Sequence, residues 1–440
     1  MTRTMIMAAF LQAQNCSNYA ASWRHSQSSP AFMTAEYYQG IGRTLEQGKF
    51  HLAFFDDRLA MPDRYGDDHS LAVSGGIRVV KMDLVPLMTA MGLATRYLGI
   101  GGTYSTTYHE PFHVARVFST LDHMINGRVA WNIVTSFNDS EAKNFGLASH
   151  LEHDLRYDRA DEFMEAVMGH WDSWADDAIE FDRGSRRFAD PAKVRRLDHE
   201  GSWFKSRGPF TVPRTPQGRP VLIQAGQSGR GRRFGARWAE LVFVVQADLQ
   251  SAREMYRGIK QAVAEAGREV DSVRVLPAVY CVGGETRAIA QERFAYVESL
   301  AEEADKLVLL SEIVNVDLSK LDLDQPLPES MTAGRGRPAD GAPVPTLKEF
   351  LASSNRGTVR ELPCFVGTPA DIADELETWF TTPACDGFVI AATHVPGAYE
   401  EFVRTVVPEL QRRGLFHREY AGQTLRDNLG LPRALRDDWR

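Results

Sequence analysis

Eight short apolar runs, separated by longer amphipathic stretches, are the feature that most limits how this chain can fold. The runs span residues 5–11, 52–57, 98–103, 129–135, 221–226, 241–245, 273–284 and 387–392. Near-continuous apolar runs of this length are typical of parallel strands that are covered on both faces. Apolar residues at three- and four-residue spacing predict helices between them, over 35–50, 85–97, 111–124, 159–174, 251–267 and 369–380.

This alternation predicts an α/β fold, a TIM barrel of eight parallel strands with helices around it. A doubly wound sheet is the alternative. We expect a single domain over residues 1–440 that carries insertions near 56–82, 175–220 and 303–362. A hairpin is possible within the second insertion, at 199–210. The third is rich in Pro and Gly, and it is equally well interpreted as an active-site lid or as a loop without a role.

Charge and composition exclude several classes of protein. The 440 residues carry a net charge of −8 and no basic stripe, so we expect no nucleic-acid partner. No window approaches 18 uninterrupted apolar residues, and the N-terminus resembles a first strand more than a signal peptide. The four cysteines include no CxxC pair, which favours a reduced, cytoplasmic protein.

Polar residues recur where the predicted strands end, which is where the active site of a TIM barrel lies. Asp57 ends the second strand, and Thr103 ends the third. Asn132 lies inside the fourth, in the apolar run VAWNIVT, where a buried carboxamide without partners costs roughly 1–3 kcal/mol. The fifth strand runs into QAGQSGRG at 224–231. Each of these could belong to a pocket or merely to a turn.

The QAGQSGRG segment indicates an anion site. Ser228 is placed as the N-cap of a following helix, and Gly229 follows it. Free N–H groups and the positive end of the helix dipole suit a phosphate there. A plain capped helix fits equally well. The glycine spacing is not GxGxxG, so a Rossmann dinucleotide site is a poor interpretation.

The segment HLEHDLRYDRADEF at 150–163 allows two interpretations. His150 and His153 are three residues apart, a spacing that metal ligands use, but no cysteine or second pair supports a metal nearby. We therefore expect no metal. His153 and Tyr157 are four apart and share a helix face, from which they could hold a cofactor phosphate or ring. No GxSxG elbow is present, so no Ser-His-Asp triad is assigned.

Long blocks of the chain carry a family resemblance. They include TYSTTYHEPFHVARVFSTLDHMINGRVAWNIVTSFNDSEAKNFG, HLEHDLRYDRADEF, GPFTVPRTPQGRPVLIQAGQSGRGRRFGARWAELVF and a C-terminal stretch beginning DGFVIAATHVPGAYEEF. The chain resembles the bacterial luciferase-like flavin-dependent monooxygenases of the nitrilotriacetate and dibenzothiophene sulfone monooxygenase group. The resemblance implies a TIM barrel and a two-component enzyme that takes reduced FMN, as a diffusible co-substrate, from a separate NAD(P)H-dependent flavin reductase. With O2 it would form a flavin peroxide and oxygenate a small organic compound.

The resemblance also implies roles for individual residues, although it identifies no catalytic residue. The cofactor-binding positions are Asp57, Thr103 and Asn132 around the flavin ring, and His153, Tyr157, Ser228 and Gly229 around the phosphate. The candidates for the substrate pocket are Phe10, Cys16, Trp23, His25 and Phe55.

The early strand ends are mostly aromatic and acidic, whereas a carboxylate-rich substrate would need cationic groups. We therefore expect a fairly hydrophobic cyclic substrate bearing sulfur, nitrogen or halogen, of the kind met in xenobiotic degradation. An aminopolycarboxylate substrate is the alternative. A flavin-binding protein without oxygenase turnover and, more weakly, a metal-dependent hydrolase are the other readings. Relatives are dimers or tetramers, so we expect a homo-oligomer.

Overall fold

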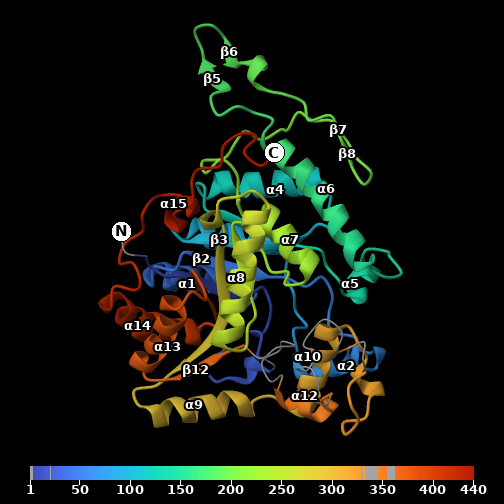
Figure 1. Ribbon diagram of the computed structural model, residues 1–440, viewed down its shortest axis with the longest axis vertical. Coiled ribbons are helices and arrows are strands. Elements are labelled where there is room, and N and C mark those ends of the chain that lie inside the picture. The colour runs from blue at the N-terminus through green and yellow to red at the C-terminus, as the bar shows by residue number, and fades with distance from the viewer. Residues whose placement is uncertain (1–2, 20, 329–330, 332–343, 354–361) are drawn as a thin grey trace.

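The computed structural model describes residues 3–19, 21–328, 331, 344–353 and 362–440, and its centre is a closed parallel barrel (Figure 1). The eight barrel strands are β1 (Ile6–Gln12), β2 (Leu52–Asp56), β3 (Gly99–Ser105), β4 (Val129–Val134), β9 (Val221–Gln224), β10 (Leu241–Val244), β11 (Arg274–Gly283) and β13 (Gly387–Ala391). Pairing of β10 with β11 closes the ring. All eight strands predicted from the sequence are confirmed, and the doubly wound alternative is wrong.

One strand of the sheet was not predicted. β12 (Cys364–Gly367) pairs with the second half of β11, at Tyr280–Gly283, and lies outside the ring. The first half of β11 pairs with β10 and β13 inside the ring. The ten-residue β11 is therefore long enough to serve the barrel and then support an extra strand.

Helices surround the barrel in chain order. They are α1 (Ala35–Gln47), α3 (Leu84–Leu93), α4 (Pro111–Met124), α6 (His153–Trp171), α7 (Gly229–Trp238), α8 (Leu249–Glu265), α13 (Pro369–Thr381) and α14 (Gly397–Arg412). The six predicted helices are confirmed. α6 begins six residues before the predicted start because the Glu152 carboxylate accepts hydrogen bonds from the amides of Asp154 and Leu155. No helix in the described part of the chain is long and apolar enough to cross a membrane.

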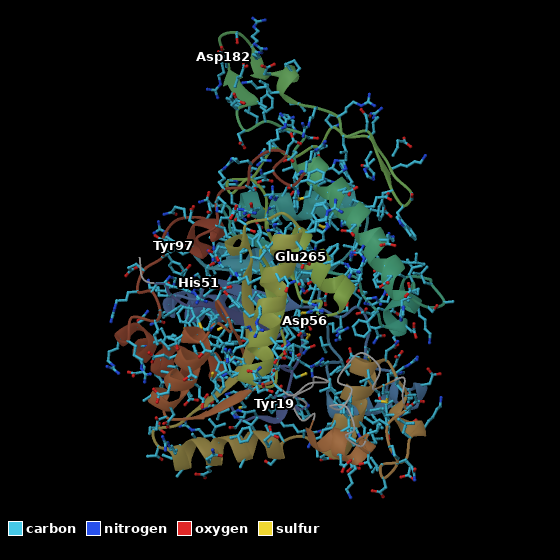
Figure 2. The ribbon with its side chains drawn as sticks, viewed as in Figure 1. Tyr19, His51, Asp56, Tyr97, Asp182 and Glu265 are labelled. Atoms are coloured by element: carbon cyan, nitrogen blue, oxygen red, sulfur yellow. The ribbon has the colours of Figure 1, made fainter. Side chains whose placement is uncertain are left out.

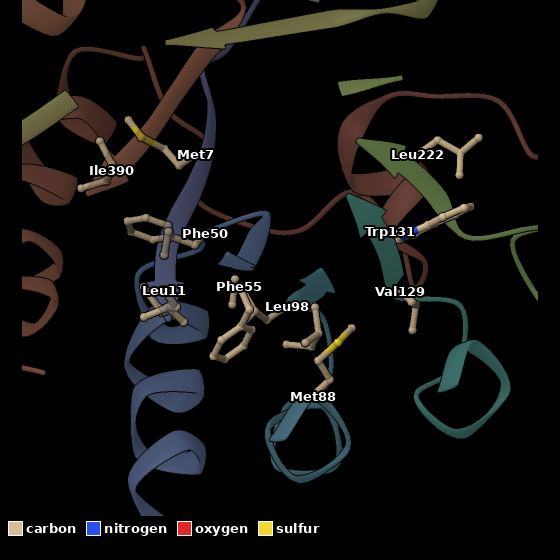
Figure 3. Packing of buried hydrophobic residues seen from close by; sticks show 14 of the residues in the cluster. Met7, Leu11, Phe50, Phe55, Met88, Leu98, Val129, Trp131, Leu222 and Ile390 are labelled. Atoms are coloured by element: carbon tan, nitrogen blue, oxygen red, sulfur yellow. The ribbon is translucent and has the colours of Figure 1, made fainter. Parts of the chain in front are cut away.

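Alternate residues of each strand face opposite layers. Inside the barrel, Phe10 of β1 pairs in register with Phe54 of β2, and their rings stack with centroids 5.5 Å apart. The outward residues pack against the helices; Figure 3 shows Leu11, Phe55 and Trp131 in this outer layer. Buried apolar side chains on both faces explain why the strands read as continuous apolar runs.

The C-terminal segment closes the end of the barrel at which the strands begin. Leu425 and Leu429 of α15 (Leu425–Leu429), with Leu431 after it, belong to the same apolar cluster as the barrel interior. Arg426 is buried and makes a bidentate ion pair with Glu240, with N–O distances of 2.6 and 2.9 Å. The segment around α15 is therefore part of the core.

The three predicted insertion segments carry short elements of their own. The first contains α2 (Ser70–Gly75), and the third contains α10 (Glu303–Val314), which contacts α2, and α12 (Leu347–Ser353). The second contains the hairpin β5–β6 (Ile179–Asp182, Arg187–Ala189), which projects away from the barrel in Figure 1, with Asp182 near its tip in Figure 2. It also contains the hairpin β7–β8 (His199–Glu200, Lys205–Ser206), whose turn packs on α6 through Phe204 and Phe163. The hairpin predicted within 199–210 is thus confirmed, whereas the single-domain assignment stays a prediction.

Candidate active site

A polar layer lies at the carboxyl ends of four neighbouring strands. Gln12 of β1 pairs in register with Asp56 of β2, two residues beyond the stacked phenylalanines. Thr103 of β3 pairs in the same way with Asn132 of β4. The two-residue period of a strand turns all four side chains toward the barrel side. The barrel interior is therefore apolar below and polar at its mouth, as a TIM-barrel active site requires.

Asn132 is buried, with only 2% of its surface exposed, and half of its carboxamide is satisfied. Its Nδ2 donates to the hydroxyl of Thr103 at 2.9 Å, and that hydroxyl donates to the carbonyl of Phe55 at 2.9 Å. Its Oδ1 is buried and has no hydrogen-bond partner among the described residues. An orphaned acceptor of this kind suits a ligand that brings an N–H or O–H donor.

Asp57 follows β2 at the same mouth. Its Oδ1 accepts a hydrogen bond from the amide of Arg58 at 2.8 Å. Burial, reinforced by the neighbouring Asp56 carboxylate and partly opposed by Lys81, raises the pKa of Asp57 to about 7. The carboxyl group therefore exchanges a proton near neutral pH, and in its protonated form it is a donor.

Two helix starts, those of α6 and α7, meet where the sequence predicts an anion site at QAGQSGRG. Ser228 is the N-cap of α7, and its hydroxyl accepts a hydrogen bond from the amide of Gly231 at 3.0 Å, so the predicted cap is confirmed. His153 Nε2 lies 3.3 Å from the same hydroxyl. The Tyr157 hydroxyl, one turn further along α6, hydrogen-bonds to Ser228 and Thr135.

Glycines leave space around the cluster formed by Ser228, His153 and Tyr157. A Cβ on Gly231 or on Gly226 would lie within 2.7 Å of the Tyr157 hydroxyl oxygen, whereas a Cβ on Gly229 would make only an ordinary contact with Arg233 Nη1 at 3.9 Å. Nearby, Arg230 is already paired with Asp158 and Asp161. The free N–H groups and dipole of α7, rather than that arginine, are therefore the groups available to an anion.

The cluster around Ser228 and the pair of Asn132 and Thr103 together fit FMN. Ser228 and Gly229 are exposed, as a phosphate at the pocket mouth requires, while Asn132 and Thr103 are buried, as a flat ring requires. Ser228, His153, Tyr157 and the first amides of α7 would hold the phosphate. The orphaned Oδ1 of Asn132 would accept from the ring.

The five substrate-pocket candidates do not all come together. Phe10 faces the barrel, and Cys16 lines a small cavity beside Gln12. Trp23 is 44% exposed and donates its indole N–H to the carbonyl of Gly75 at 2.6 Å. His25 stacks on His394 at 3.5 Å and lines a separate cavity of about 460 Å³.

Phe55 lies on the opposite face of β2 from the pocket. It is fully buried against Tyr38 in the layer between strands and helices (Figure 3). The aromatic residue of β2 on the barrel side is Phe54, whose ring also contacts Phe243 edge-on at 4.9 Å. Phe10 points into the barrel and pairs in register with Phe54, so Phe54 points inward and Phe55 outward.

Several polar residues at the mouth were not singled out from the sequence. Gln12 ends β1, and its position at a strand end was the available signal. Arg78, Lys81 and Glu312 come from the first and third insertions, and their approach to the mouth depends on how those segments pack; Lys81 lies 3.7 Å from the Glu312 carboxylate. No local sequence pattern carries that information.

The histidine pair is not built as a metal centre. His150 Nε2 lies 3.6 Å from Asp139, whereas His153 faces Ser228 and Asp154. Over the residues that the structure describes, no three His, Cys, Asp or Glu side chains are grouped to hold a metal ion.

Comparison with known proteins agrees with this geometry. Residues 15–386 match the family described as luciferase-like monooxygenase. The chain is 46% identical to dibenzothiophene-sulfone monooxygenase of Rhodococcus erythropolis, with 98% of this chain and 97% of that protein covered. It is 38% identical to nitrilotriacetate monooxygenase component A of Aminobacter aminovorans, with 93% of each covered. A crystal structure of riboflavin lyase with modified FMN and riboflavin superposes with a TM-score of 0.90 at 32% identity, covering 97% of this chain and 96% of that one.

The fold and the site define a flavin-dependent barrel enzyme, and the chain belongs to the luciferase-like monooxygenase family. The resemblance inferred from its sequence is confirmed, and so is the luciferase-like TIM barrel. The protein is accordingly a monooxygenase, which uses reduced FMN and O2.

Proposed function

We propose that this enzyme binds reduced FMN with its phosphate at the start of α7 and its ring against Asn132, and oxygenates a hydrophobic cyclic compound. The observation that carries the proposal is the buried Oδ1 of Asn132, which has no partner among the described residues, on a strand whose neighbour β9 leads into the exposed helix start at Ser228. A binding site for a group with a flat N–H-bearing ring and a phosphate explains both features. Neither a capped helix nor a structural amide explains both.

When bound, reduced FMN supplies the electrons that activate O2. The chain's own contribution is to position the ring and to exclude water from it. Phe10, Phe54 and Phe243 provide an apolar floor, and Thr103 holds the Asn132 amide in one orientation. Asp57, with its pKa raised to about 7, can hold or release a proton at its carboxylate oxygens.

The proposed substrate is a cyclic compound that bears sulfur, nitrogen or halogen. Stacked aromatic rings at the barrel floor support it, because they suit a flat apolar ring. The alternative, an aminopolycarboxylate, is favoured by the nitrilotriacetate relative but finds few unpaired cations at the mouth. Lys81 is beside Glu312 and Arg58 interacts with Asp56 and Glu141, whereas Arg78 donates to the neutral Asn18 and keeps its charge.

One experiment separates the monooxygenase from a flavin-binding protein without turnover. The purified protein is mixed with chemically reduced FMN and then with oxygen-18 gas, in the presence of dibenzothiophene sulfone or nitrilotriacetate. We expect slower flavin reoxidation than in free solution, and one labelled oxygen atom in the product. Flavin that binds but reoxidises as fast as free FMN, with no labelled product, contradicts the proposal.

Ser228→Ala tests the phosphate site. Loss of a hydrogen bond to a charged group should weaken binding of reduced FMN by about 1–3 kcal/mol. Riboflavin, which has no phosphate, provides the matched control ligand, and its affinity should be the same in both proteins. Equal FMN affinity in the two proteins would refute the assignment.

Three further features are proposed from the family alone. An NAD(P)H-dependent flavin reductase supplies the reduced FMN, since no second cofactor site is apparent in the predicted positions and the relatives include a protein named as component A. The enzyme works in the cytoplasm, where such a reductase has its nucleotide. It forms a homodimer or homotetramer.

A further inference from the structure

Three buried nitrogen atoms beside the barrel mouth lack hydrogen-bond partners among the described residues. They are Nε2 of Gln12, Nε2 of Gln14 and Nε of Arg78. Gln14 and Arg78 are 6% and 5% exposed. Each unmade hydrogen bond of a buried donor costs about 1–3 kcal/mol, so three at one place indicate a built site that awaits an acceptor.

The three residues line one cavity together with Asp57 and Lys81. Its volume is about 10 Å³, which is about the space that one water-sized group needs. A ring cannot enter it, but a single oxygen atom can. Asp56, which pairs in register with Gln12, also lines the cavity, and Figure 2 shows it between the barrel and the insertion helices.

The cavity adjoins the aromatic floor. Gln12 is two residues beyond Phe10 on the same face of β1, and Asp56 is two residues beyond Phe54 on β2. A flat ring that lies against these phenylalanines would therefore direct a substituent toward the cavity. The donors are placed to receive an atom of the substrate, one layer above its ring.

The charges around the cavity cancel. Its lining carries the cations Arg58, Arg78 and Lys81 against the acids Asp56 and Asp57. Asp57 is only partly ionised near pH 7, and two further buried carboxylates supply the remaining negative charge: Glu312, 3.7 Å from the Lys81 ammonium, and Glu141, which interacts with Arg58. A carboxylate would gain no net attraction here while losing its hydration. A neutral, strongly dipolar oxygen accepts the same hydrogen bonds without that cost.

We propose that this cavity is the specificity subsite for the substrate and binds one oxygen of a neutral sulfone-type group through Gln12, Gln14 and Arg78. The proposal rests on the proposed function, since it names the group by which that enzyme selects its cyclic substrate. An ordered water holds the same place before the substrate enters. The side-chain amide of Gln14, not the flavin, decides whether an oxidised sulfur is preferred over an unoxidised one.

The test is a binding measurement that requires no turnover. Equilibrium dialysis without reductant compares dibenzothiophene sulfone, dibenzothiophene and nitrilotriacetate on the wild-type protein, Gln14→Met and Gln27→Met. Methionine keeps the length of glutamine and removes the donor. Gln27 is an exposed glutamine outside this cavity and provides the control. FMN affinity is measured on the same samples.

We expect the wild-type protein and Gln27→Met to bind the sulfone more tightly than dibenzothiophene. Gln14→Met should lose about 5- to 100-fold in affinity for the sulfone, the range for one hydrogen bond to a buried group, and little for dibenzothiophene. Equal losses for both probes, tighter binding of nitrilotriacetate than of the sulfone, or no binding of any probe would overturn the proposal. Weakened FMN binding with the sulfone unaffected would assign the cavity to the flavin instead, and also overturn it. If the oxygenase test fails but these affinities are as expected, the proposed function is refuted and the subsite proposal stands.

Discussion

Replacing Asn132 by leucine should separate the stability of the flavin-free protein from its affinity for FMN. Leucine fills nearly the same volume and removes a buried acceptor that has no partner, which costs the wild-type fold about 1–3 kcal/mol. It also removes the hydrogen bond to Thr103, worth about 1 kcal/mol. We therefore expect the free energy of unfolding, measured with urea on flavin-free protein, to stay equal or rise by up to about 2 kcal/mol.

The same change should weaken FMN binding. A ring N–H that loses its acceptor on transfer to a buried site costs about 1–3 kcal/mol, equivalent to about 5- to 150-fold in the dissociation constant. Fluorescence titration of FMN measures this. Thr103→Val is the matched control, since it breaks the same hydrogen bond but keeps Oδ1 available to the flavin, and its FMN affinity should change far less.

Two outcomes would refute this reasoning. Unchanged FMN affinity in Asn132→Leu would show that Oδ1 is not a flavin acceptor. A loss of several kcal/mol in the flavin-free protein would show that Asn132 holds the strand in place rather than waiting for a ligand.

Three more predictions follow from buried groups and close approaches. Arg426→Met should reduce the free energy of unfolding by about 3–5 kcal/mol, because it leaves the Glu240 carboxylate buried without its partner, and adding Glu240→Gln should recover much of the loss in urea unfolding. Asp57 has a pKa of about 7 in the fold against 3.8 for an ordinary aspartate, so the folded protein keeps a proton between about pH 4 and pH 7 that the unfolded chain has lost, and the stability contribution falls as pH rises through this window. Asp57→Asn should remove that slope, and the stability difference between the two proteins should be larger at about pH 8 than at about pH 5; equal differences would contradict the assigned pKa. Gly231→Ala should weaken FMN binding by about 1–3 kcal/mol because its Cβ would crowd the phosphate site, whereas Gly40→Ala, which meets open space in a helix, should leave FMN affinity unchanged in the same titration.

The barrel could be predicted from the sequence because its strands are covered on both faces. Coverage makes each strand a continuous apolar run, and the helices between them must present one apolar stripe. β12 escaped because it is only four residues long and has Cys364 and Val366 partly exposed. The apolar pattern of α6 begins only at residue 159, because its first turns are charged and its cap is a glutamate rather than the usual small polar residue, although His153 and Tyr157 were expected to share a helix face.

The site was predictable where its residues end a strand or begin a helix. Ser228 begins α7, and Asn132 is conspicuous as a polar residue inside the apolar strand β4. Phe55 was wrongly predicted to face the pocket. Of two adjacent strand residues only one can face the pocket, and the register between β1 and β2, which the sequence does not reveal, shows that this residue is Phe54. Arg78 and Lys81 reach the mouth only through the packing of insertion segments, so nothing in their own neighbourhood along the chain indicates it.

The C-terminal segment has a consequence for how the protein is made. Leu425, Leu429 and Leu431 fill the lower end of the barrel, and Arg426 neutralises Glu240 there. A ribosome releases these residues after all eight barrel strands. Until then the nascent barrel has an open apolar base and an unpaired buried carboxylate, which are surfaces that chaperones recognise. The core is therefore sealed only after every barrel strand has been made, and a chain shortened before Leu425 should depend on chaperones for its solubility.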